Sequence, residues 1–421
     1  MSAAAAKRDY KQQYNSAALK TAAIDRAYNH LKRAAVDGQD ALLVARIVEL
    51  CRPFLDAPLS HQCVEERLML IGRQRQQLEV LKAIPNIEQR TPEWYEARKR
   101  LVTASSLAQA LGLGKYKSQK DLIIEKCGYK EVPFMTAPPL IWGTKYEPVA
   151  GDIYKRRNKA ELYEFGLIPH PTISFFGASP DGITDCGTML EIKCPYMRKI
   201  TGEIPQEYFY QIQGQLDVCD LNECDYIECS FQEYDGGYAS FADDTQCVDG
   251  DYYTLDMCEK GVFLEYRGMA DKSSYSYGPA NSSPEVARDW VVAETERLYA
   301  AGAELVKETY WKLAEYMCKR VFRDQEFMTT RYLELEQVWN RILLYRHNRE
   351  LYDREIEPPT SGQNVKTISI RGGGKRAAAA STTTTLTLMD TPVSIDLDTT
   401  PQDTKMFQAY AFKARESDDW Q

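Results

Sequence analysis

Long apolar runs are missing from this 421-residue sequence. No uninterrupted apolar segment approaches the length of about 20 residues that a helix needs to cross a bilayer. The alanine-rich start, residues 1–6, also lacks the long apolar segment of a secretory signal peptide. We therefore expect a soluble, intracellular protein with no membrane partner.

Cysteines form no recognisable framework, and histidines are few. The 11 cysteines are an odd number scattered along the chain, which fits a reducing compartment better than a disulfide-linked scaffold. With only 4 histidines, no histidine-based catalytic set is apparent. We expect most of the cysteines to be buried thiols.

An excess of positive charge is also missing, since the formal net charge is -9. Phosphate contacts by Lys and Arg usually dominate the affinity of a protein for nucleic acid. Here the basic residues are clustered, while acidic residues gather in 243–251 and in the carboxyl-terminal tail. The basic clusters are 98–100, 115–117, 155–157 and 198–199. Each cluster alone is as readily a solvated helix face, but an acidic exterior around a basic channel is compatible with nucleic acid.

The most informative stretch runs from Ser179-Pro180-Asp181-Gly182 to Leu190-Glu191-Ile192-Lys193-Cys194-Pro195. Alternation along a strand places Glu191 and Lys193 on one face, and the polar segment 184–187 predicts a turn that folds Asp181 back beside Glu191. Two clustered carboxylates repel unless a cation lies between them, and an oxygen-only cluster suits Mg²⁺ or Mn²⁺ better than zinc. With a lysine nearby, the pattern predicts a divalent-metal site for phosphodiester hydrolysis.

Three further motifs accompany this hairpin, in a fixed order along residues 90–270. They are Trp94-Tyr95-Glu96-Ala97-Arg98 leading to Thr103-Ala104-Ser105, then Trp142-Gly143-Thr144-Lys145-Tyr146-Glu147, and finally Tyr208-Phe209-Tyr210-Gln211-Ile212-Gln213. Together with Asp181 and Glu191-Ile192-Lys193, they resemble the lambda exonuclease and YqaJ branch of the PD-(D/E)xK nucleases. An isolated aspartate followed by Glu-x-Lys occurs by chance in many proteins, but four ordered motifs are much more specific.

The resemblance implies roles for individual residues at the metal site. Asp181 and Glu191 would be metal ligands, completed by Glu147 and by the backbone carbonyl of Ile192. Lys193 would orient or polarise the attacking water. Gln211 would contact the backbone of the scissile strand, with Tyr208 on the same face of its helix as a DNA contact.

A second set of residues would hold a terminal 5′-phosphate. Arg98 and Ser105 match the phosphate-binding positions of the lambda-type enzymes, and the first turn of a helix opened by Thr103 would offer N–H groups to an anion. Lys115 stands about where the family has a further arginine. Lysine keeps the charge but loses the forked geometry, so the preference for phosphate could be weaker.

The pattern along the chain predicts an α/β fold with a mixed sheet flanked by helices, plus helical additions at both ends, and the resemblance implies that its core is a PD-(D/E)xK restriction-endonuclease-like core. The predicted divisions are a helical extension at 1–90, the nuclease core at 91–270, a helical region at 271–357 and a disordered tail at 358–421. Within the core and the region after it, the predicted helices are one that opens at residues 91–92, then 103–112, 118–128, 142–158 and 205–219, with further helices from 283 to 349. The predicted strands are 162–168, 172–176, 226–233 and 261–266. The added terminal regions make the chain look more like the alkaline nucleases of large DNA viruses, by analogy of fold only.

The function that the resemblance implies is a Mg²⁺-dependent 5′→3′ exonuclease on double-stranded DNA, with Mn²⁺ as a possible substitute. It would act on DNA ends and leave 3′ single-stranded overhangs for viral recombination, repair or end processing, in the host cytoplasm or nucleus. Lambda-type relatives form rings around DNA and cooperate with a single-strand annealing protein. The alternatives are a structure- or site-selective endonuclease of the same fold and a catalytically silent nucleic-acid-binding module.

Overall fold

The computed structural model describes residues 16–32, 40–130, 137–268 and 273–356. The chain divides into two compact units, residues 1–342 and residues 343–421. Among the described helices we find none that combines the length and the apolarity needed to cross a bilayer.

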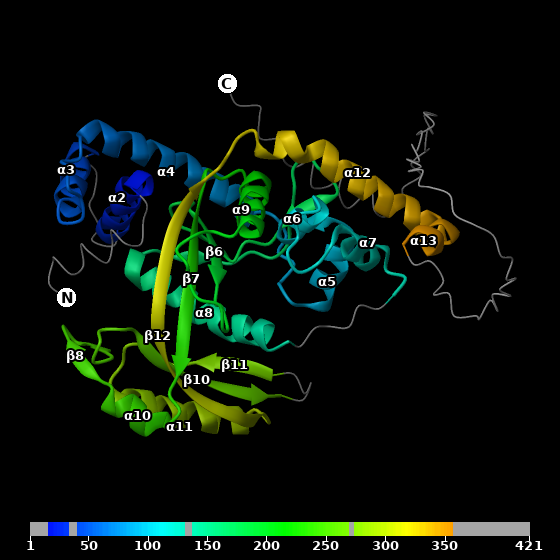
Figure 1. The fold of residues 1–421 in the computed structure, drawn as a ribbon. Helices are drawn as coiled ribbons and strands as arrows, with labels where there is room; N and C mark the ends of the chain where they lie inside the picture. The colour runs from blue at the N-terminus through cyan, green and yellow to red at the C-terminus, as the bar shows by residue number, and fades with distance from the viewer. Residues whose placement is uncertain (1–15, 33–39, 131–136, 269–272, 357–421) are drawn as a thin grey trace, which may run out of the picture. The chain divides into compact units, whose positions relative to one another are not determined.

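A mixed seven-stranded sheet lies in the first unit (Figure 1). Its strands are β2 (Leu162–Tyr163), β5 (Gly182–Thr184), β6 (Met189–Lys193), β7 (Glu223–Glu233), β10 (Lys260–Arg267), β11 (Ser273–Tyr277) and β12 (Glu304–Phe322). The strand order is β11-β10-β12-β7-β6-β5-β2. Only β6 and β7 pair in parallel, and the other neighbours in this sheet are antiparallel.

Helices cover both faces of the sheet around β6. On one face, Ile192 and Ile227 share a buried core with α2 (Ser16–Lys32), α3 (Asp40–Cys51), α4 (His61–Lys82) and α8 (Pro138–Asn158). On the other face, which Glu191 shares by strand alternation, lies α9 (Gln206–Cys219). This arrangement confirms the predicted α/β class with a mixed sheet flanked by helices.

Two smaller sheets and several helices complete the first unit. The three-stranded sheet has the order β1-β4-β3, and β8 pairs with β9. These strands are β1 (Val102–Thr103), β3 (Ile168–Pro169), β4 (Phe176–Ala178), β8 (Gln246–Val248) and β9 (Asp251–Tyr253). The remaining helices are α5 (Pro92–Lys99), the 3-10 turn η1 (Ala104–Ser106), α6 (Leu107–Ala110), α7 (Gln119–Cys127), α10 (Gly237–Asp243), α11 (Pro284–Ala300) and α12 (Phe327–His347), of which residues 343–347 belong to the second unit.

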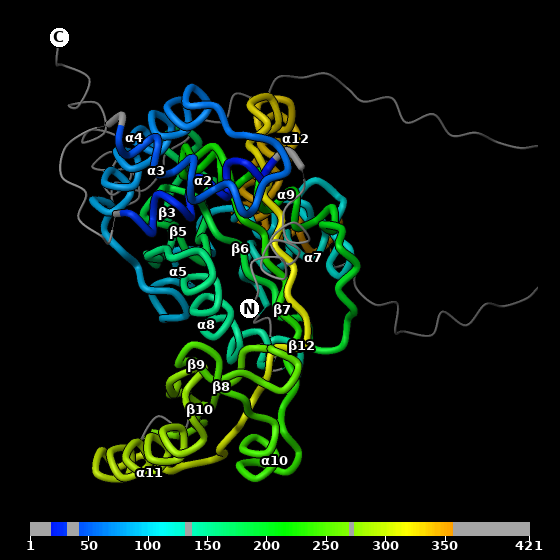
Figure 2. The backbone as a smooth tube through the Cα atoms, turned by 90° about the vertical axis from the view of Figure 1, so that its left-hand side faces the viewer, coloured from blue at the N-terminus to red at the C-terminus, as the bar shows by residue number. Residues whose placement is uncertain are grey.

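The two ends of the long strands β7 and β12 pack against different helices. Helices α2–α4 lie near one end, and α10 and α11 lie near the other (Figure 2). At the second end, Phe241 of α10, Val291 of α11 and Tyr310 of β12 belong to one apolar cluster.

The helices predicted at 142–158 and 205–219 are confirmed as α8 and α9, and the strands predicted at 226–233 and 261–266 as β7 and β10. The predicted helix 103–112 is instead divided between η1 and α6. The prediction of one strand at 162–168 is also wrong, since only β2 at its start and β3 at its end are strands. Between them, Gly166 lies against the linker before α5. A Cβ on Gly166 would lie 1.8 Å from the carbonyl oxygen of Ile87, and the Gly166 N–H donates to Asn86 Oδ1 at 2.7 Å.

The strand predicted at 172–176 is wrong over most of its length, since β4 begins only at Phe176. The imidazole of His170 explains the difference. Its Nδ1 accepts hydrogen bonds from the backbone N–H groups of Thr172 at 3.1 Å and Ile173 at 3.0 Å, which closes a turn.

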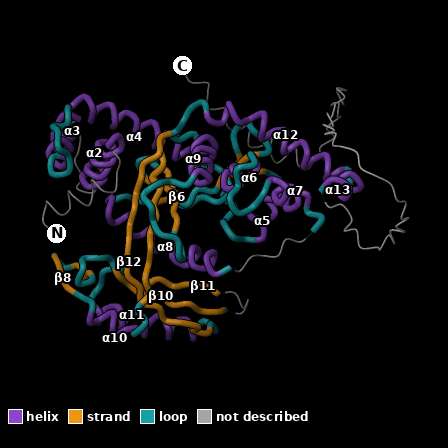
Figure 3. The backbone as a smooth tube through the Cα atoms, viewed as in Figure 1, coloured by secondary structure: helices purple, strands orange, loops and turns teal. Residues whose placement is uncertain are grey.

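The prediction of helices throughout 283–349 is wrong for residues 304–322, which form β12. Glu, Lys, Leu and Ala in this stretch favour a helix locally. Pairing with β7 on one side and β10 on the other overrides that preference, with a register shift between Leu313 and Glu315. Figure 3 shows β12 running beside β7 through the sheet. The region 271–357, which was predicted to be helical, therefore contributes strands to the same sheet as β5 and β6.

The second unit is described only over residues 343–356. There α13 (Arg349–Glu355) folds back on the end of α12, where the Tyr345 hydroxyl donates to Glu355 Oε2 at 3.0 Å. The disordered tail predicted at 358–421 lies outside the described residues.

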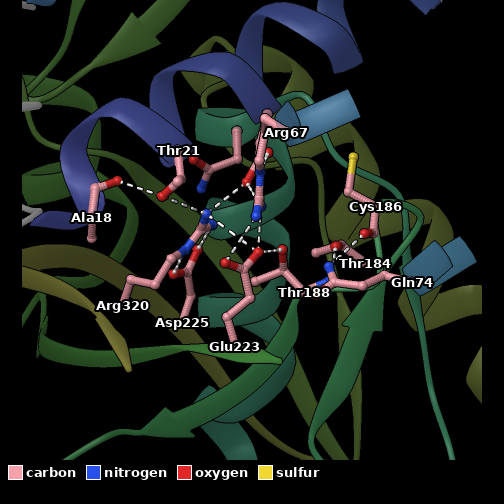
Figure 4. A network of polar contacts seen from close by, with 12 residues as sticks. Ala18, Thr21, Arg67, Gln74, Thr184, Cys186, Thr188, Glu223, Asp225 and Arg320 are labelled. Atoms are coloured by element: carbon pink, nitrogen blue, oxygen red, sulfur yellow. Dashed lines mark hydrogen bonds and ion pairs between the residues drawn. The ribbon is translucent and has the colours of Figure 1, made fainter. Parts of the chain in front are cut away.

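A buried ion-pair network joins the amino-terminal helices to the sheet (Figure 4). Arg67 of α4 forms ion pairs with Asp25 of α2 at 2.6 Å and with Glu223 of β7. Arg320 of β12 pairs with Asp25 at 2.6 Å and with Asp225 of β7 at 2.8 Å. All five side chains are buried, so the helices of residues 16–82 are packed into the same interior as the sheet.

Candidate active site

The hairpin of β5 and β6 brings Asp181 beside the end of β6. Gly182 pairs with Leu190 and Ile183 with Met189, so Asp181 lies opposite Glu191 in the antiparallel register. The Asp181 Oδ2 atom accepts a hydrogen bond from the backbone N–H of Ile192 at 2.7 Å. The predicted hairpin geometry is therefore confirmed.

Both oxygens of the Glu191 carboxylate have partners. The ammonium of Lys193 forms an ion pair with Oε1, and the side-chain amide of Gln215 donates to Oε2 at 2.9 Å. Glu191 is completely buried, whereas the Lys193 side chain is 24% exposed. Glu191 thus lies between the buried amide of Gln215 and the more accessible ammonium of Lys193.

Glu147 approaches the same strand end from α8. Arg90, in the linker before α5, holds both of its oxygens, at 3.0 and 2.8 Å. Arg90 has a left-handed backbone with φ of 68°, a conformation that costs energy for any residue other than glycine. The ion pair with Glu147 fixes the side chain of Arg90 as well as its backbone.

The carboxylates of Asp181, Glu191 and Glu147 repel one another electrostatically. Burial raises the pKa of Asp181 well above its usual range, and repulsion from Glu191 and Glu147 raises it further. Burial also raises the pKa of Glu147, although Arg90 and Lys193 oppose that rise. Burial alone would lower the pKa of Lys193, but Glu191 and Asp181 outweigh it and raise the pKa, so Lys193 stays charged.

The donor set fits a hard divalent cation by its chemistry, because Asp181, Glu191 and Glu147 offer only oxygen. Burial raises the pKa of Asp181 most, and the neighbouring carboxylates Glu191 and Glu147 raise it further, so a cation beside Asp181 would favour its ionised form. In the described part of the chain, no three His, Cys, Asp or Glu side chains are grouped closely enough to hold a metal ion as they stand. Lys193 and Arg90 supply the positive charge instead, by pairing with Glu191 and Glu147.

Helix α9 adds aromatic and amide side chains to the site. The Lys193 ammonium lies 5.0 Å from the centre of the Tyr208 ring, so Tyr208 belongs to the site's immediate surroundings. Gln211 is half-buried one turn further along α9. Among the described residues it forms no hydrogen bond with Asp181, Glu191 or Lys193.

Arg98 and Ser105 are brought together, as predicted. One guanidinium nitrogen of Arg98 donates to Ser105 Oγ at 3.1 Å and to Thr103 Oγ1 at 3.3 Å, while its carbon lies 4.3 Å from the centre of the Trp94 ring. Burial lowers the pKa of Arg98. Within the described residues Arg98 forms no ion pair, so its charge is available to an anion.

The hydrogen bonds of Trp94 connect this pair to the hairpin. The Trp94 indole N–H donates to Ser179 Oγ at 3.1 Å, two residues before Asp181. The amide of Gln89 donates to the carbonyl of Pro180 at 3.3 Å. The helix that carries Arg98 is therefore attached directly to the segment that carries Asp181.

Lys115 is not joined to this pair. Its ammonium lies 5.3 Å from the Tyr116 ring, and no hydrogen bond or ion pair connects it to Arg98 or Ser105, all of which lie in the described part of the chain. The helix that was predicted to open at Thr103, with Ser105 in its first turn, is also shorter than expected. Ser105 lies in the three-residue turn η1, which is followed by the four-residue helix α6.

Two residues that contact the site were not predicted from the sequence. Gln215 holds Glu191, and Arg90 holds Glu147. The spacing of four residues from Gln211 placed Gln215 on the same helical face, which was the available signal. No comparable sequence pattern links Arg90 to Glu147, because their contact depends on the path of the linker before α5.

Comparisons with known proteins agree with the family resemblance. Residues 93–222 match the model of the YqaJ-like viral recombinase domain. An uncharacterized protein of Acanthamoeba polyphaga mimivirus is 30% identical over 319 residues, which cover 68% of this chain and 58% of that protein. A protein of African swine fever virus (strain Badajoz 1971 Vero-adapted) is 25% identical over 177 residues, which cover 34% of this chain and 50% of that protein. The matches thus span between half and three fifths of these relatives.

Solved structures of two exonucleases are also similar. The alkaline exonuclease LHK-Exo from Laribacter hongkongensis aligns with a TM-score of 0.38 and 22% identity, covering 63% of this chain and 100% of that one. A phage-related exonuclease from Haemophilus somnus 129PT aligns with a TM-score of 0.31 and 13% identity, covering 60% of this chain and 95% of that one. The family match contains Arg98, Glu147 and the Asp181–Lys193 hairpin. Residues 93–222 of this chain are therefore similar to the YqaJ-like viral recombinase domain.

Proposed function

We propose that this protein is a divalent-metal-dependent 5′→3′ exonuclease that degrades one strand of double-stranded DNA from its ends. The observation that carries the proposal is the convergence of Asp181, Glu191 and the charged Lys193 at the end of β6. It is supported by the location of these residues within a YqaJ-like viral recombinase domain. The products would be 3′ single-stranded overhangs for recombination, repair or end processing of viral DNA.

The carboxylates would hold Mg²⁺, or Mn²⁺ in its place. Asp181 and Glu191 would be direct ligands, with Glu147 and the backbone carbonyl of Ile192 as further oxygen donors. When bound, the cation would supply an activated water and neutralise charge on the phosphate. Lys193 pairs with Glu191 Oε1, and Arg90 pairs with Glu147. The metal ion would displace both of these basic side chains from the carboxylate oxygens.

Lys193 has the charge and the position to act on the reacting groups. Its pKa is raised by Glu191 and Asp181 despite burial, so it remains an ammonium at neutral pH. Released from Glu191, it would orient the attacking water or donate to a phosphate oxygen. Tyr208 and Gln211, on α9, would contact the backbone of the scissile strand.

Arg98 and Ser105 would hold the 5′-phosphate of the strand being degraded. Arg98 donates to two hydroxyl groups and forms no ion pair within the described residues, so a phosphate would gain a charge-assisted partner. The bonds from Trp94 to Ser179 and from Gln89 to Pro180 support a fixed spacing between that phosphate and Asp181. Lys115 would add a further positive charge near the end of the DNA.

The partners follow from the same proposal. The protein would bind DNA ends in the host cytoplasm or nucleus, possess a ring-like homo-oligomeric form as lambda-type enzymes do, and cooperate with a single-strand annealing protein. The viral origin of the relatives supports a role in viral DNA metabolism.

The test is degradation of end-labelled linear duplex DNA by the full chain, with Mg²⁺ and with excess chelator. We expect mononucleotide release with Mg²⁺ and none with chelator. Lys193→Ala should reduce the rate by about a hundredfold or more, because it removes a group that acts in the transition state. Equal cleavage in chelator, or a fully active Lys193→Ala protein, would contradict the proposal.

A further inference from the structure

Gln215 contacts Glu191 from the interior of the protein. It lies on α9, is 1% exposed, and donates from Nε2 to Glu191 Oε2 at 2.9 Å, while Glu191 itself is fully buried. An ionised carboxylate only accepts hydrogen bonds, so the amide must turn its NH₂ group toward Glu191. The orientation of Gln215 is therefore dictated by Glu191.

That orientation leaves the other end of the amide without a partner. The Gln215 Oε1 atom is buried and accepts no hydrogen bond from any described residue. Buried polar atoms are nearly always paired, so an unpaired one calls for an explanation. The contact with Glu191 provides it, since turning the amide over would place Oε1 against a carboxylate oxygen.

Gln213, two residues earlier on the same helix, is a glutamine with a structural role and serves as a comparison for Gln215. It is also 1% exposed, but both ends of its amide are paired. Nε2 donates to the carbonyl of Phe322 at 2.9 Å, and Oε1 accepts from the backbone N–H of Asp324 at 2.8 Å. Gln213 thus fixes α9 to the end of β12, whereas Gln215 serves Glu191.

We propose that Gln215 is a positioning residue that holds Glu191 Oε2 and thereby directs Oε1 toward the space shared with Asp181 and Lys193. The role rests on the proposed metal-dependent nuclease function. Because the Lys193 side chain is 24% exposed and Gln215 is 1% exposed, Lys193 is the partner that gives way when Oε1 takes a cation. Gln215 then keeps the carboxylate oriented.

The experiment compares Mn²⁺ binding and thermal unfolding of the full chain without DNA, for wild type, Gln215→Met and Gln213→Met. Methionine has a similar length and cannot donate a hydrogen bond. We expect Gln215→Met to weaken Mn²⁺ binding by about tenfold or more, as loss of an outer partner of a metal ligand typically does. Gln213→Met should bind Mn²⁺ within about twofold of wild type and unfold at a lower temperature.

Wild-type affinity of Gln215→Met for Mn²⁺ would overturn the role of Gln215. If wild type and Gln215→Met both bind Mn²⁺ with the same affinity and both cleave DNA, the role of Gln215 fails and the proposed function stands. If wild type neither binds Mn²⁺ nor cleaves DNA, the proposed function fails and this role fails with it.

A second measurement applies if Gln215→Met does not fold. The side-chain amide signals of Gln215 and Gln213 are followed by NMR in the wild-type protein as Mg²⁺ is added. The Gln215 signals should shift with the bound fraction, and those of Gln213 should stay in place. A Gln215 signal that is unmoved at saturating Mg²⁺ would contradict the proposal.

Discussion

Asp181 occupies a position that favours function over stability. Its pKa is raised by burial and by Glu191 and Glu147, so its folded-state pKa lies above the unfolded value of 3.8. A group with a raised pKa contributes its stability below the unfolded value, and that contribution is lost as the pH rises through the folded value. At neutral pH and without metal, the Asp181 carboxylate therefore opposes folding.

Replacing Asp181 by asparagine should raise the thermal midpoint of the metal-free protein and abolish cleavage. The amide keeps an oxygen for the Ile192 N–H but carries no charge. The gain in midpoint should shrink as the pH falls toward 4, where the wild-type carboxyl becomes protonated. Thermal unfolding at several pH values in chelator, with a cleavage assay in Mg²⁺, measures both effects.

Asp185→Asn is the matched control. Asp185 is a second aspartate of this hairpin and is buried, and its Oδ1 accepts a hydrogen bond from the Glu161 backbone N–H at 3.3 Å. We expect this change to leave cleavage within a few-fold of wild type. A lower midpoint for Asp181→Asn than for wild type would contradict the electrostatic account.

Local sequence was sufficient to predict Asp181, Glu191 and Lys193 as neighbours, because one hairpin brings them together. It was not sufficient for Gln215 or Arg90. Gln215 reaches Glu191 only because α9 packs on that face of β6, and Arg90 reaches Glu147 only because the linker passes the start of α8. Helical spacing places Gln215 on the face of Gln211, but it does not reveal which strand that face meets, and no sequence pattern reveals the path of the linker that carries Arg90.

At the scale of elements, two arginines connect α2 and α4 to β7 and β12. Arg67 and Arg320 face Asp25, Glu223 and Asp225, and all five are buried. Removing one partner from such a network leaves charges without compensation, which typically costs about 3 to 5 kcal/mol. Arg67→Met should therefore lower the free energy of unfolding by about 3 kcal/mol or more, as measured by urea denaturation.

The control is Arg46→Met on α3. Arg46 pairs with Glu49 at 3.0 Å, but both side chains are about 60% exposed. Exposed pairs of this kind contribute about 1 kcal/mol or less. Equal destabilisation by the two substitutions would show that the buried network does not hold the helices on the sheet.

The same network predicts sensitivity to acid. Burial alone would raise the pKa of Asp25, but Arg67 and Arg320 outweigh burial and lower it below 3.8. A lowered pKa gives stability that is present above the unfolded value and is lost as the pH falls through the folded value. The stability difference between wild type and Asp25→Asn should therefore be constant near neutral pH and shrink below pH 3.8. A difference that grew on acidification would contradict this assignment.

Element prediction succeeded where periodicity agreed with packing and failed where it did not. Helices α8 and α9 follow their apolar spacing, and β7 and β10 their apolar content. Strand β12 carries helix-favouring residues such as Leu313, Ala314 and Glu315. It is a strand because β7 and β10 supply hydrogen-bond partners along both of its edges, which no local pattern reveals.

At the scale of the molecule, the two terminal regions should differ in their importance for folding. A chain beginning at residue 91 lacks Asp25 and Arg67, and leaves Glu223 and Arg320 with fewer partners in the interior. We expect it to be insoluble or unstable. A chain ending at residue 357 should keep the wild-type thermal midpoint and nuclease rate, because residues 358–421 are polar and repetitive in composition.

Expression of both truncated chains, followed by thermal unfolding and the cleavage assay, tests this difference. A stable, active chain beginning at residue 91 would show that the predicted extension is separable after all. An inactive chain ending at residue 357 would show that the tail contributes to the fold or to the site.

We expect this protein to degrade DNA from a 5′-phosphorylated end. The direct measurement is the initial rate with Mg²⁺ on linear duplex with 5′-phosphate, the same duplex with 5′-hydroxyl, and closed circular DNA, for wild type and Arg98→Ala. We predict that wild type digests the phosphorylated duplex fastest, loses about tenfold to a hundredfold without the phosphate or without Arg98, and leaves circular DNA intact. Equal rates on all three substrates would contradict the account and favour an endonuclease.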